Sequence, residues 1–403
     1  SSLVDFSLNQ EQTAWQDKAR KFAEQEIAPL SLERDAIPDP FDAFDWEIIK
    51  KGSKLGFRTA VVSKEQGDHG IDFVTQATVM AELAKADSAI SKTFSQCWKW
   101  SHLIAAVCHD DQKERFLKPF LADDTFVLGF GATEPNGGSD NRMPPPGDIK
   151  AGHRLAGRVE GDTMVLNGDK VFIANGSIAK LFFVYVRTDP TVPIGQGTTL
   201  MMVPRDTPGF RHGKVFNKSG WRFYQNAELI FENAQVPMAN MVGELNGALR
   251  RREGEIGGDL FGDLELAANG LGICDAACEK AIALVRARTN GGALKDQQLI
   301  QLKIGRMKML TEALRSYVMR VAREHDEHIL STNAGLVMNL ATDIIQEVTE
   351  IGMEVFDHAG SPMDRAIDKL VRDTFIWSHL AGDSVQRIKV ARRILSEEQF
   401  NLV

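Results

Sequence analysis

GFGATEPNGGSD, at residues 129–140, joins the small-residue end of a strand to a turn that is rich in backbone hydrogen-bond donors. Gly137 and Gly138 allow positive φ angles and a close approach of the backbone to a ligand. Thr133 and Ser139 add hydroxyls that can bind phosphate groups or the edge of a heterocycle. Taken alone, a cluster of this composition is commonly an ordinary turn. The stretch therefore indicates a site for a polyanionic cofactor only in combination with the motifs that follow it.

Helical periodicity dominates the two ends of the chain. In residues 8–120, apolar residues recur three to four positions apart, most clearly in 11–27, 42–55 and 74–86. After residue 246 the same spacing returns, and it predicts one apolar helix face. The residues of that face are Met307, Leu310, Leu314, Tyr317, Val318 and Val321.

The middle of the chain has a different pattern. From residue 126 onward, short apolar runs replace the helical spacing, and turn residues separate them at Gly161-Asp162 and Asn167-Gly168. This pattern predicts a compact β-domain of hairpins between two helical parts. The runs that we expect to be strands are 164–166, 171–173, 181–186 and 200–203.

Composition and charge limit the classes of partner. The chain has 403 residues and a formal net charge of −8, and it carries no basic stripe, so we expect no nucleic-acid partner. Its four cysteines show no CxxC pairing, which favours the cytoplasm, or a matrix if a targeting segment has been removed. No apolar run is long enough to cross a bilayer, so we expect no membrane association.

Three further motifs follow the opening stretch along the chain: FIANG at 172–176, GWR at 220–222 and ELIFENAQVP at 228–237. Together with the opening stretch, this ordered set resembles the acyl-CoA dehydrogenase flavoprotein family over nearly the whole chain. The resemblance implies a mainly α fold with a central β-domain. It places a helical bundle at residues 1–125, a small β-barrel-like domain at 126–245 and a C-terminal helical bundle at 246–403.

The resemblance also implies an activity, a cofactor and partners. FAD would lie between the β-domain and a helical bundle, with an acyl-CoA thioester stacked on the flavin. The chain would be an acyl-CoA dehydrogenase, an oxidoreductase that introduces an α,β double bond. Electrons would pass to electron-transfer flavoprotein, and the usual assembly would be a homotetramer.

Carried over residue by residue, the resemblance supplies candidate cofactor contacts. Phe172 would cover the flavin where the family commonly has Trp, and Ala174 stands where Thr or Ser is more usual near the flavin N5. Arg288, Thr289 and Gln298 match a region that contacts the flavin of a neighbouring subunit. The other candidates are Phe130, Ala132, Thr133, Gly138, Ser139 and Asp383.

The expected catalytic glutamate is missing. Many family members carry it directly before the glycine that is Gly382 here, where this chain has Ala381. Some relatives carry it instead on the helix that opens the last bundle, at the position of Gly262. A carboxylate held between flavin and thioester would be desolvated, which suits a base near neutral pH. We therefore expect a relocated base among the nearby acidic residues Asp259, Asp263, Glu265 and Asp383.

Two alternatives to a relocated base stay open. A substrate with an α-carboxylate would form its enolate by losing carbon dioxide, and a β-sulfinate that leaves as sulfite would also change the need for a base. Either anion would require a cation such as Lys99, Arg142 or Arg222. Alternatively, the chain is a non-catalytic subunit of a mixed oligomer.

Aromatic residues suggest the size of the acyl group. CWKWS at 97–101 falls where the family lines its acyl pocket, and Phe375 and Trp377 lie near the missing glutamate. Bulky rings shorten a channel, which favours a short, branched, cyclic or aryl acyl group. The cluster HDEH at 325–328 lacks a recognised metal-ligand spacing, so we expect no metal.

Overall fold

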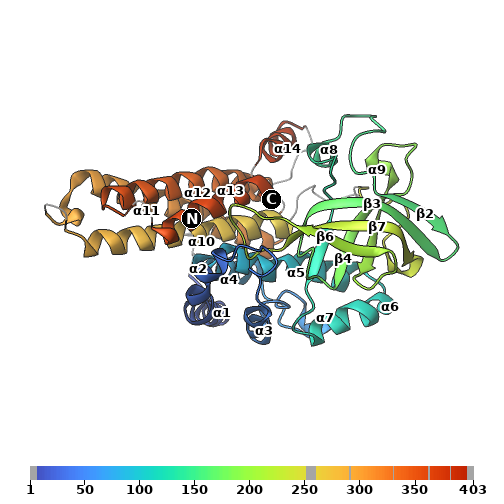
Figure 1. Ribbon diagram of the computed structural model, residues 1–403, viewed down its shortest axis with the longest axis horizontal. Coiled ribbons are helices and arrows are strands. Elements are labelled where there is room, and N and C mark those ends of the chain that lie inside the picture. The colour runs from blue at the N-terminus through green and yellow to red at the C-terminus, as the bar shows by residue number, and fades with distance from the viewer. Residues whose placement is uncertain are drawn as a thin grey trace.

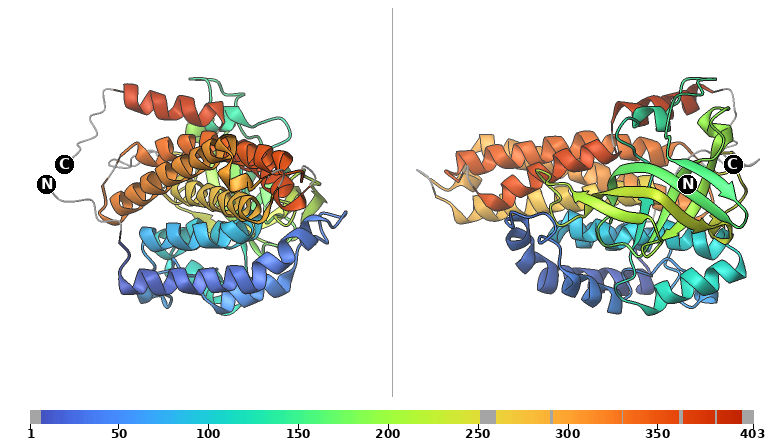
Figure 2. Two further views of the ribbon diagram at one scale, coloured as in Figure 1. Left: turned by 90° about the vertical axis from the view of Figure 1, so that its left-hand side faces the viewer. Right: turned by 45° about the vertical axis from the view of Figure 1, so that its right-hand side comes forward.

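The computed structural model describes residues 7–250, 260–289, 292–329, 331–361, 364–381 and 383–396. Figure 1 shows a β-domain at one end of the molecule and a bundle of long C-terminal helices that extends away from it. The N-terminal helices form a layer along the bundle, which Figure 2 shows from its end. This arrangement confirms the predicted fold class of two helical parts around a central β-domain.

The N-terminal part begins with α1 (Gln10–Phe22), where Asn9 and Gln12 form a reciprocal capping box. Helical structure continues without a break to Asp35, and a second capped helix begins after Asp45. The remaining elements are η1 (Ala23–Ile27), α2 (Ala28–Asp35), α3 (Trp46–Lys54), η2 (Lys64–Gln66), α4 (Phe73–Ala86), α5 (Ser88–Val107), α6 (Asp110–Gln112), η3 (Lys113–Leu117) and α7 (Lys118–Ala122).

The β-domain is one sheet whose main path runs β6-β7-β3-β1-β4-β5-β8, with β2 paired to β3 and β4. The predicted turn at Gly161-Asp162 does join the antiparallel strands β2 and β3. The predicted turn at Asn167-Gly168 is wrong, because these residues lie inside β3 at a register shift where Gly168 has a φ of 138°. The strands are β1 (Leu128–Gly131), β2 (Ala156–Glu160), β3 (Thr163–Ala174), β4 (Leu181–Arg187), β5 (Thr198–Pro204), β6 (Phe210–Val215), β7 (Asn226–Pro237) and β8 (Met241–Val242).

The C-terminal bundle is built around α10 (Leu260–Ala287), which packs against α4 on one side and against α12 (Asn333–His358) on the other. Of the face predicted on α11 (Gln298–Asp326), Met307, Leu314, Val318 and Val321 are buried, while Leu310 and Tyr317 are partly buried against the core. The bundle is completed by α13 (Arg365–Ala381), while α14 (Ser384–Leu395) lies beside the short helix α8 (Ser139–Arg142) of the β-domain (Figure 1).

A buried charge cluster connects all three parts. The Lys369 ammonium lies 2.6 Å from an Asp373 oxygen and 3.1 Å from an Asp87 oxygen, so it joins α13 to the start of α5. Asp373 also accepts a hydrogen bond from the backbone N–H of Trp221, which belongs to the β-domain. Asp87 caps α5 and accepts from the hydroxyl of Ser31 on α2. Burial favours neutral Lys369, but the two carboxylates outweigh burial and raise the pKa of this lysine.

Close packing at Gly220 supports the same junction. A Cβ at this position would lie 2.2 Å from the carbonyl oxygen of Arg372, so only glycine lets the loop approach α13 so closely. The neighbouring Trp221 is fully buried, and its indole N–H donates to the Ser88 hydroxyl at 2.8 Å. The GWR motif is therefore the point where the β-domain is fixed to both helical parts.

We predict that Lys369→Met lowers the free energy of unfolding by about 3–5 kcal/mol, because two buried carboxylates lose their cation. Urea denaturation measures this change. The exposed Lys308→Met, which removes a surface pair with Glu312 on α11, should cost at most about 1 kcal/mol. Equal denaturation midpoints for wild type and Lys369→Met would contradict the structural role of the cluster.

A buried histidine inside the β-domain creates a dependence on pH. The Nε2 atom of His153 lies 2.8 Å from the Thr198 hydroxyl, whose proton is directed to the carbonyl of Ile194. The hydroxyl therefore accepts from Nε2–H, while the buried Nδ1 has no acceptor among the described residues for a second ring proton. Burial, followed by the nearby Lys170 and Arg187 cations, lowers the pKa of His153 to about 3.

His153 binds a proton in the unfolded chain below about pH 6.5, but in the folded chain only near pH 3. Between these two pH values the unfolded chain binds the extra proton, so the free energy of unfolding falls as the pH is lowered. Between about pH 7.5 and about pH 5, the wild type should lose about 2 kcal/mol more unfolding free energy than His153→Gln, which cannot titrate. Urea denaturation at the two pH values checks this. An equal loss in the two proteins would be evidence against a neutral His153.

Candidate active site

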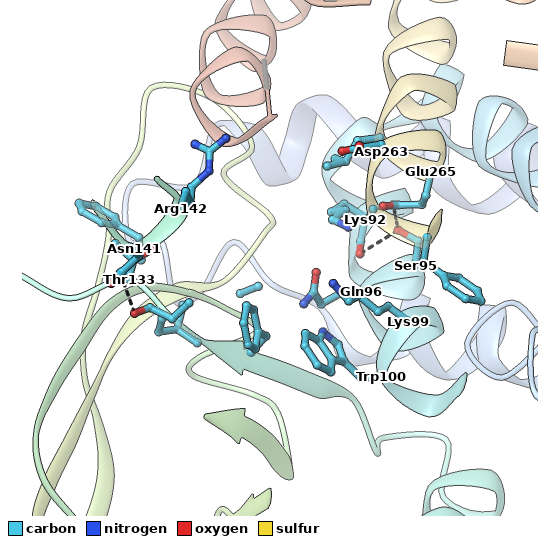
Figure 3. Close-up of a pocket in the computed structure, with 18 of the residues that line it drawn as sticks. Lys92, Ser95, Gln96, Lys99, Trp100, Thr133, Asn141, Arg142, Asp263 and Glu265 are labelled. Atoms are coloured by element: carbon cyan, nitrogen blue, oxygen red, sulfur yellow. Dashed lines mark hydrogen bonds and ion pairs between the residues drawn. The ribbon is translucent and has the colours of Figure 1, made fainter. Parts of the chain in front are cut away.

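A cavity of about 610 Å³ lies between the β-domain and the helices α5 and α10. In Figure 3 the labelled Thr133, Asn141 and Arg142 lie on the β-domain side, while Lys92, Gln96 and Glu265 lie on the helical side. Its volume is within the range usual for pockets that bind small molecules or cofactors. We refer to it as the interdomain cavity.

The β-domain wall contains much of the predicted flavin contact set. Phe130, Ala132, Thr133, Phe172 and Ala174 all line the interdomain cavity, as does Gly138. Phe172 has a φ of 57° at a register shift in β3, and its side chain is 51% exposed. Because a bulge redirects a side chain out of the sheet, the strand presents this aromatic ring to the cavity instead of burying it.

The opening stretch is held in place by the buried carboxylate of Glu134, for which the sequence had indicated no role. Glu134 accepts hydrogen bonds from the backbone N–H groups of Arg154 and Leu155 and from the Lys170 ammonium. Lys170 also donates to the carbonyl of Ala132 at 3.2 Å. Burial lowers the pKa of Lys170 to about 8, although Glu134 opposes the shift. These contacts fix the backbone on which Thr133 is presented.

The turn after Glu134 is ordered by Asp140, whose carboxylate accepts from the N–H groups of Gly138 and Gly152. Gly138 borders the cavity, whereas Ser139 is exposed and does not line it. Asn141 and Arg142 of the same turn do line the cavity; Arg142 was a candidate cation, whereas nothing in the sequence had indicated Asn141. The hydroxyl of Thr133 is thus the predicted hydroxyl of this stretch that borders the cavity.

The helical wall is unexpectedly polar. One face of α5 contributes Lys92, Ser95, Gln96 and Lys99, which have the i, i+3, i+4, i+7 spacing of neighbouring side chains on a helix. From α10, Glu265 points toward this face. Its carboxylate lies 2.8 Å from the Lys92 ammonium and also accepts from the Ser95 hydroxyl (Figure 3). All three side chains are buried.

Two of the four candidate bases line the interdomain cavity: Asp263 and Glu265. Asp263 contacts the amide nitrogen of Gln386 at 3.3 Å. Asp383 lies outside the cavity lining, where it caps α14 and pairs with Arg142 at 2.5 Å. Burial tends to raise the pKa of Asp383, but the hydrogen bonds from Arg142 and from the backbone of α14 outweigh it and lower the pKa. The fourth candidate, Asp259, falls outside the described residues.

The candidate cross-subunit contacts lie at the opposite end of α10. Phe261 lines the cavity near the first turn of this helix, whereas Arg288 and Thr289 follow its last residue, Ala287. At about 1.5 Å per residue, the 28 residues of α10 separate the two ends by about 42 Å. Arg288 and Gln298, which begins α11, therefore cannot contact the cavity of their own chain.

Several supporting predictions from the sequence need correction. Of the cations, Lys99 and Arg142 line the cavity, but Arg222 does not; its guanidinium donates to backbone carbonyls that include those of Asp35 and Ile37. Of the aromatic residues, Trp98 and Trp100 line the cavity, whereas Phe375 is 56% exposed and Trp377 is buried elsewhere. Arg222 and Trp377 are therefore structural, because backbone carbonyls occupy their N–H groups.

The HDEH cluster also has a structural role. The Asp326 carboxylate accepts hydrogen bonds from the backbone N–H groups of Phe73 and Val74, so it caps the start of α4. Among the described residues, no group of three or more His, Cys, Asp or Glu side chains is arranged to hold a metal ion. Within the same residues, no helix combines the length and the hydropathy needed to cross a membrane.

The cavity wall fits a flavin. A planar heterocycle needs an aromatic or apolar surface together with hydrogen-bonding groups at its edge, and Phe172 and Thr133 offer these as exposed side chains. Phe130 is stacked on Trp100, which also lines the cavity, with ring centroids 4.4 Å apart. The wall therefore offers packed aromatic side chains to the plane of a flavin ring, and it leaves the Thr133 hydroxyl accessible to the edge of that ring.

Comparisons with known proteins agree with this architecture. The chain matches the N-terminal, middle and C-terminal domains of acyl-CoA dehydrogenase at residues 9–124, 129–234 and 262–395. It is 30% identical to the short-chain-specific acyl-CoA dehydrogenase of Megasphaera elsdenii over 96% of this chain and 98% of that protein.

Two solved structures share the whole fold at 28% identity. The butyryl-CoA dehydrogenase of Megasphaera elsdenii has a TM-score of 0.86 over 98% of this chain and 100% of its own. A structure of the electron transferring flavoprotein of Acidaminococcus fermentans has a TM-score of 0.87 over the same shares. Since three domain matches cover most of the sequence in the expected order, this chain belongs to the acyl-CoA dehydrogenase family of flavoprotein oxidoreductases.

Proposed function

We propose that this protein catalyses the FAD-dependent α,β-dehydrogenation of a short acyl-CoA thioester and passes the electrons to electron-transfer flavoprotein. One observation carries the proposal: a single cavity has the aromatic and hydroxyl groups of a flavin wall on one side and two carboxylates on the other. Membership of the family and the short-chain and butyryl-CoA relatives support the choice of reaction and of chain length.

The cofactor would be held by the β-domain wall. Phe172 and Phe130 would cover the ring, while Thr133 and the backbone from Ala132 to Gly138 would bind its edge. When bound, FAD supplies the acceptor for the hydride that leaves the β-carbon. Ala174 offers no hydroxyl at this wall, so a hydrogen bond to the ring near it would have to come from another group.

We assign the general base to Asp263. A base has to take up a proton from the α-carbon, and a carboxylate oxygen that already accepts hydrogen bonds from a cation is less available for this step. Glu265 has one oxygen on the Lys92 ammonium and the other on the Ser95 hydroxyl. Asp383 is paired with Arg142 outside the cavity lining. Asp263 is the other described carboxylate of the cavity lining, where it accepts a hydrogen bond from the amide of Gln386.

Asp263→Asn should slow reduction of the bound flavin by butyryl-CoA by about 10²–10⁴-fold, because the α-proton loses its acceptor. Anaerobic stopped-flow bleaching of the flavin measures this rate. Asp17→Asn, an exposed carboxylate of α1, is the matched control and should reduce at the wild-type rate. Reduction by Asp263→Asn at the wild-type rate, together with loss of reduction in Glu265→Gln, would reassign the base to Glu265.

Fragmentation of an α-carboxylated substrate is the second candidate, since Lys99 and Arg142 place cationic side chains in the cavity wall. It predicts bleaching by an α-carboxylated acyl-CoA with release of carbon dioxide, and this bleaching would persist in Asp263→Asn. A purified protein that binds no flavin would contradict both enzymatic proposals and would support a non-catalytic subunit of a mixed oligomer.

We also propose that the active assembly is a homotetramer in which a neighbouring subunit completes the flavin site. Arg288 and Gln298 are too far from the cavity of their own chain, at the far end of α10. Leu299, Leu302 and Met309 on the adjoining part of α11 are 53%, 73% and 55% exposed, an apolar surface that suits a contact between subunits.

Arg288→Ala should therefore lower the flavin content of the purified protein by several-fold, although the residue lies 22 residues, or about 33 Å along the helix, beyond Leu266 of the cavity lining. The ratio of flavin absorbance to protein absorbance measures this. Arg320→Ala, an exposed arginine of α11 that pairs with Glu324, should retain the wild-type content. Unchanged flavin content in Arg288→Ala would argue against its predicted contact.

A further inference from the structure

The helical wall of the interdomain cavity contains a polar cluster that apolar acyl groups cannot satisfy. Its members are Lys92, Ser95 and Gln96 on α5, Glu265 on α10 and Tyr224 of the β-domain. Glu265 is 6% exposed, Ser95 3% and Tyr224 2%, so these groups are withdrawn from bulk water. We refer to this set as the polar end of the cavity.

Part of the hydrogen-bonding capacity of the Lys92 ammonium is not used by the described residues. An ammonium group carries three N–H bonds. Within the described residues, one of them is directed to Glu265 at 2.8 Å, and no other side chain or carbonyl accepts from this nitrogen. Because Lys92 lines the cavity, its remaining donors can be satisfied there, by water or by a ligand.

Gln96 adds a second set of donors. Its carbonyl oxygen accepts from the Tyr224 hydroxyl at 3.2 Å, which fixes the orientation of the amide. The amide nitrogen has no partner among the residues that the structure describes, and Figure 3 shows the side chain of Gln96 directed into the cavity beside Trp100. The polar end therefore presents hydrogen-bond donors from two neighbouring side chains of α5.

Cationic side chains outnumber carboxylates in the lining of the cavity. Lys92, Lys99, Arg142 and Lys389 contribute four cations among the described lining residues, against the two carboxylates of Asp263 and Glu265. Burying the Lys92–Glu265 pair removes two charges from water, and that cost is compensated only if the remaining donors are also bonded. A hydrocarbon chain placed against Lys92 would displace water and leave those donors without partners.

We propose that the acyl group of the substrate carries a hydrogen-bond-accepting oxygen, as a carboxylate or a hydroxyl, at its end remote from the thioester, and that Lys92 and Gln96 bind this oxygen. The inference rests on the proposed dehydrogenation only for the position of the thioester. Glu265 follows Asp263 by two residues, about 3 Å along α10, so the oxygen lies few bonds from the α-carbon. The substrate class is a short oxygenated acyl thioester, in contrast to the hydrocarbon acyl group of butyryl-CoA.

Three thioesters with the same four-carbon chain test this inference: butyryl-CoA, 4-hydroxybutyryl-CoA and succinyl-CoA. Their dissociation constants for the flavin-loaded protein are measured by anaerobic calorimetry in the Asp263→Asn background, where slow flavin reduction leaves the heat of binding separate. Succinyl-CoA or 4-hydroxybutyryl-CoA should bind about tenfold or more tightly than butyryl-CoA, since the site loses hydrogen bonds to a charged donor when the oxygen is missing. The two oxygenated compounds distinguish a carboxylate from a hydroxyl.

The variant K92M/E265Q removes both charges together, so that neither is left buried without its partner. It should bind butyryl-CoA and the oxygenated thioesters with affinities within about threefold of each other. Q96L, a second variant at a half-buried position, should lower the preference without removing a charge. Lys21→Met, at an exposed lysine of α1, is the matched control and should keep the wild-type preference.

Butyryl-CoA binding as tightly as both oxygenated thioesters would overturn the inference, as would an unchanged preference in K92M/E265Q and Q96L. Failure of every thioester to reduce the flavin would instead contradict the proposed dehydrogenation. The affinities decide the nature of the polar end in either case, because calorimetry does not require turnover.

Discussion

The rest of the structure depends on the buried contact between Lys369 and the two carboxylates of Asp87 and Asp373. Lys369 and Asp373 belong to α13 and Asp87 caps the start of α5, while Asp373 also holds the backbone of Trp221 from the β-domain. An ammonium ion in a dry junction has to stay charged and bonded, so it tolerates little displacement of any partner. The interdomain cavity lies between the parts that this contact fixes, and its shape follows from their relative position.

On each wall of the cavity, a local structural feature determines which side chains are presented to a ligand. The bulge in β3 exposes the ring of Phe172, and the buried Lys170–Glu134 pair fixes the loop that presents Thr133. On the other side, the helical spacing of α5 places charged and amide groups on the face that meets α10. The cavity therefore joins an aromatic surface to a donor-rich end over a short distance, which is an arrangement suited to selecting small polar acyl groups.

Much of this could be predicted from the sequence, and the failures have physical causes. Periodicity is a property of single elements, so it located helical parts at both ends of the chain and the apolar runs that form β3, β4 and β5, but it predicted no strand at β2, β6, β7 or β8. It could not separate a turn at Asn167-Gly168 from a bulge inside β3, because both require glycine in the same backbone region. Ordered motifs pointed to the residues of the β-domain that line the cavity, among them Phe130, Thr133 and Phe172. Lys92 was missed because its significance depends on Glu265, which is 173 residues away and pairs with it only in the folded chain.

The length of α10 has a consequence for how the activity depends on protein concentration. With the cavity at one end of this helix and Arg288 beyond the other, an isolated chain has only part of the proposed flavin site. If a neighbour supplies the missing contacts, flavin binding and subunit association are thermodynamically linked, and each strengthens the other. Dilution would then release flavin as the subunits separate, and recovery of the holoenzyme after mixing would follow kinetics of higher than first order in protein.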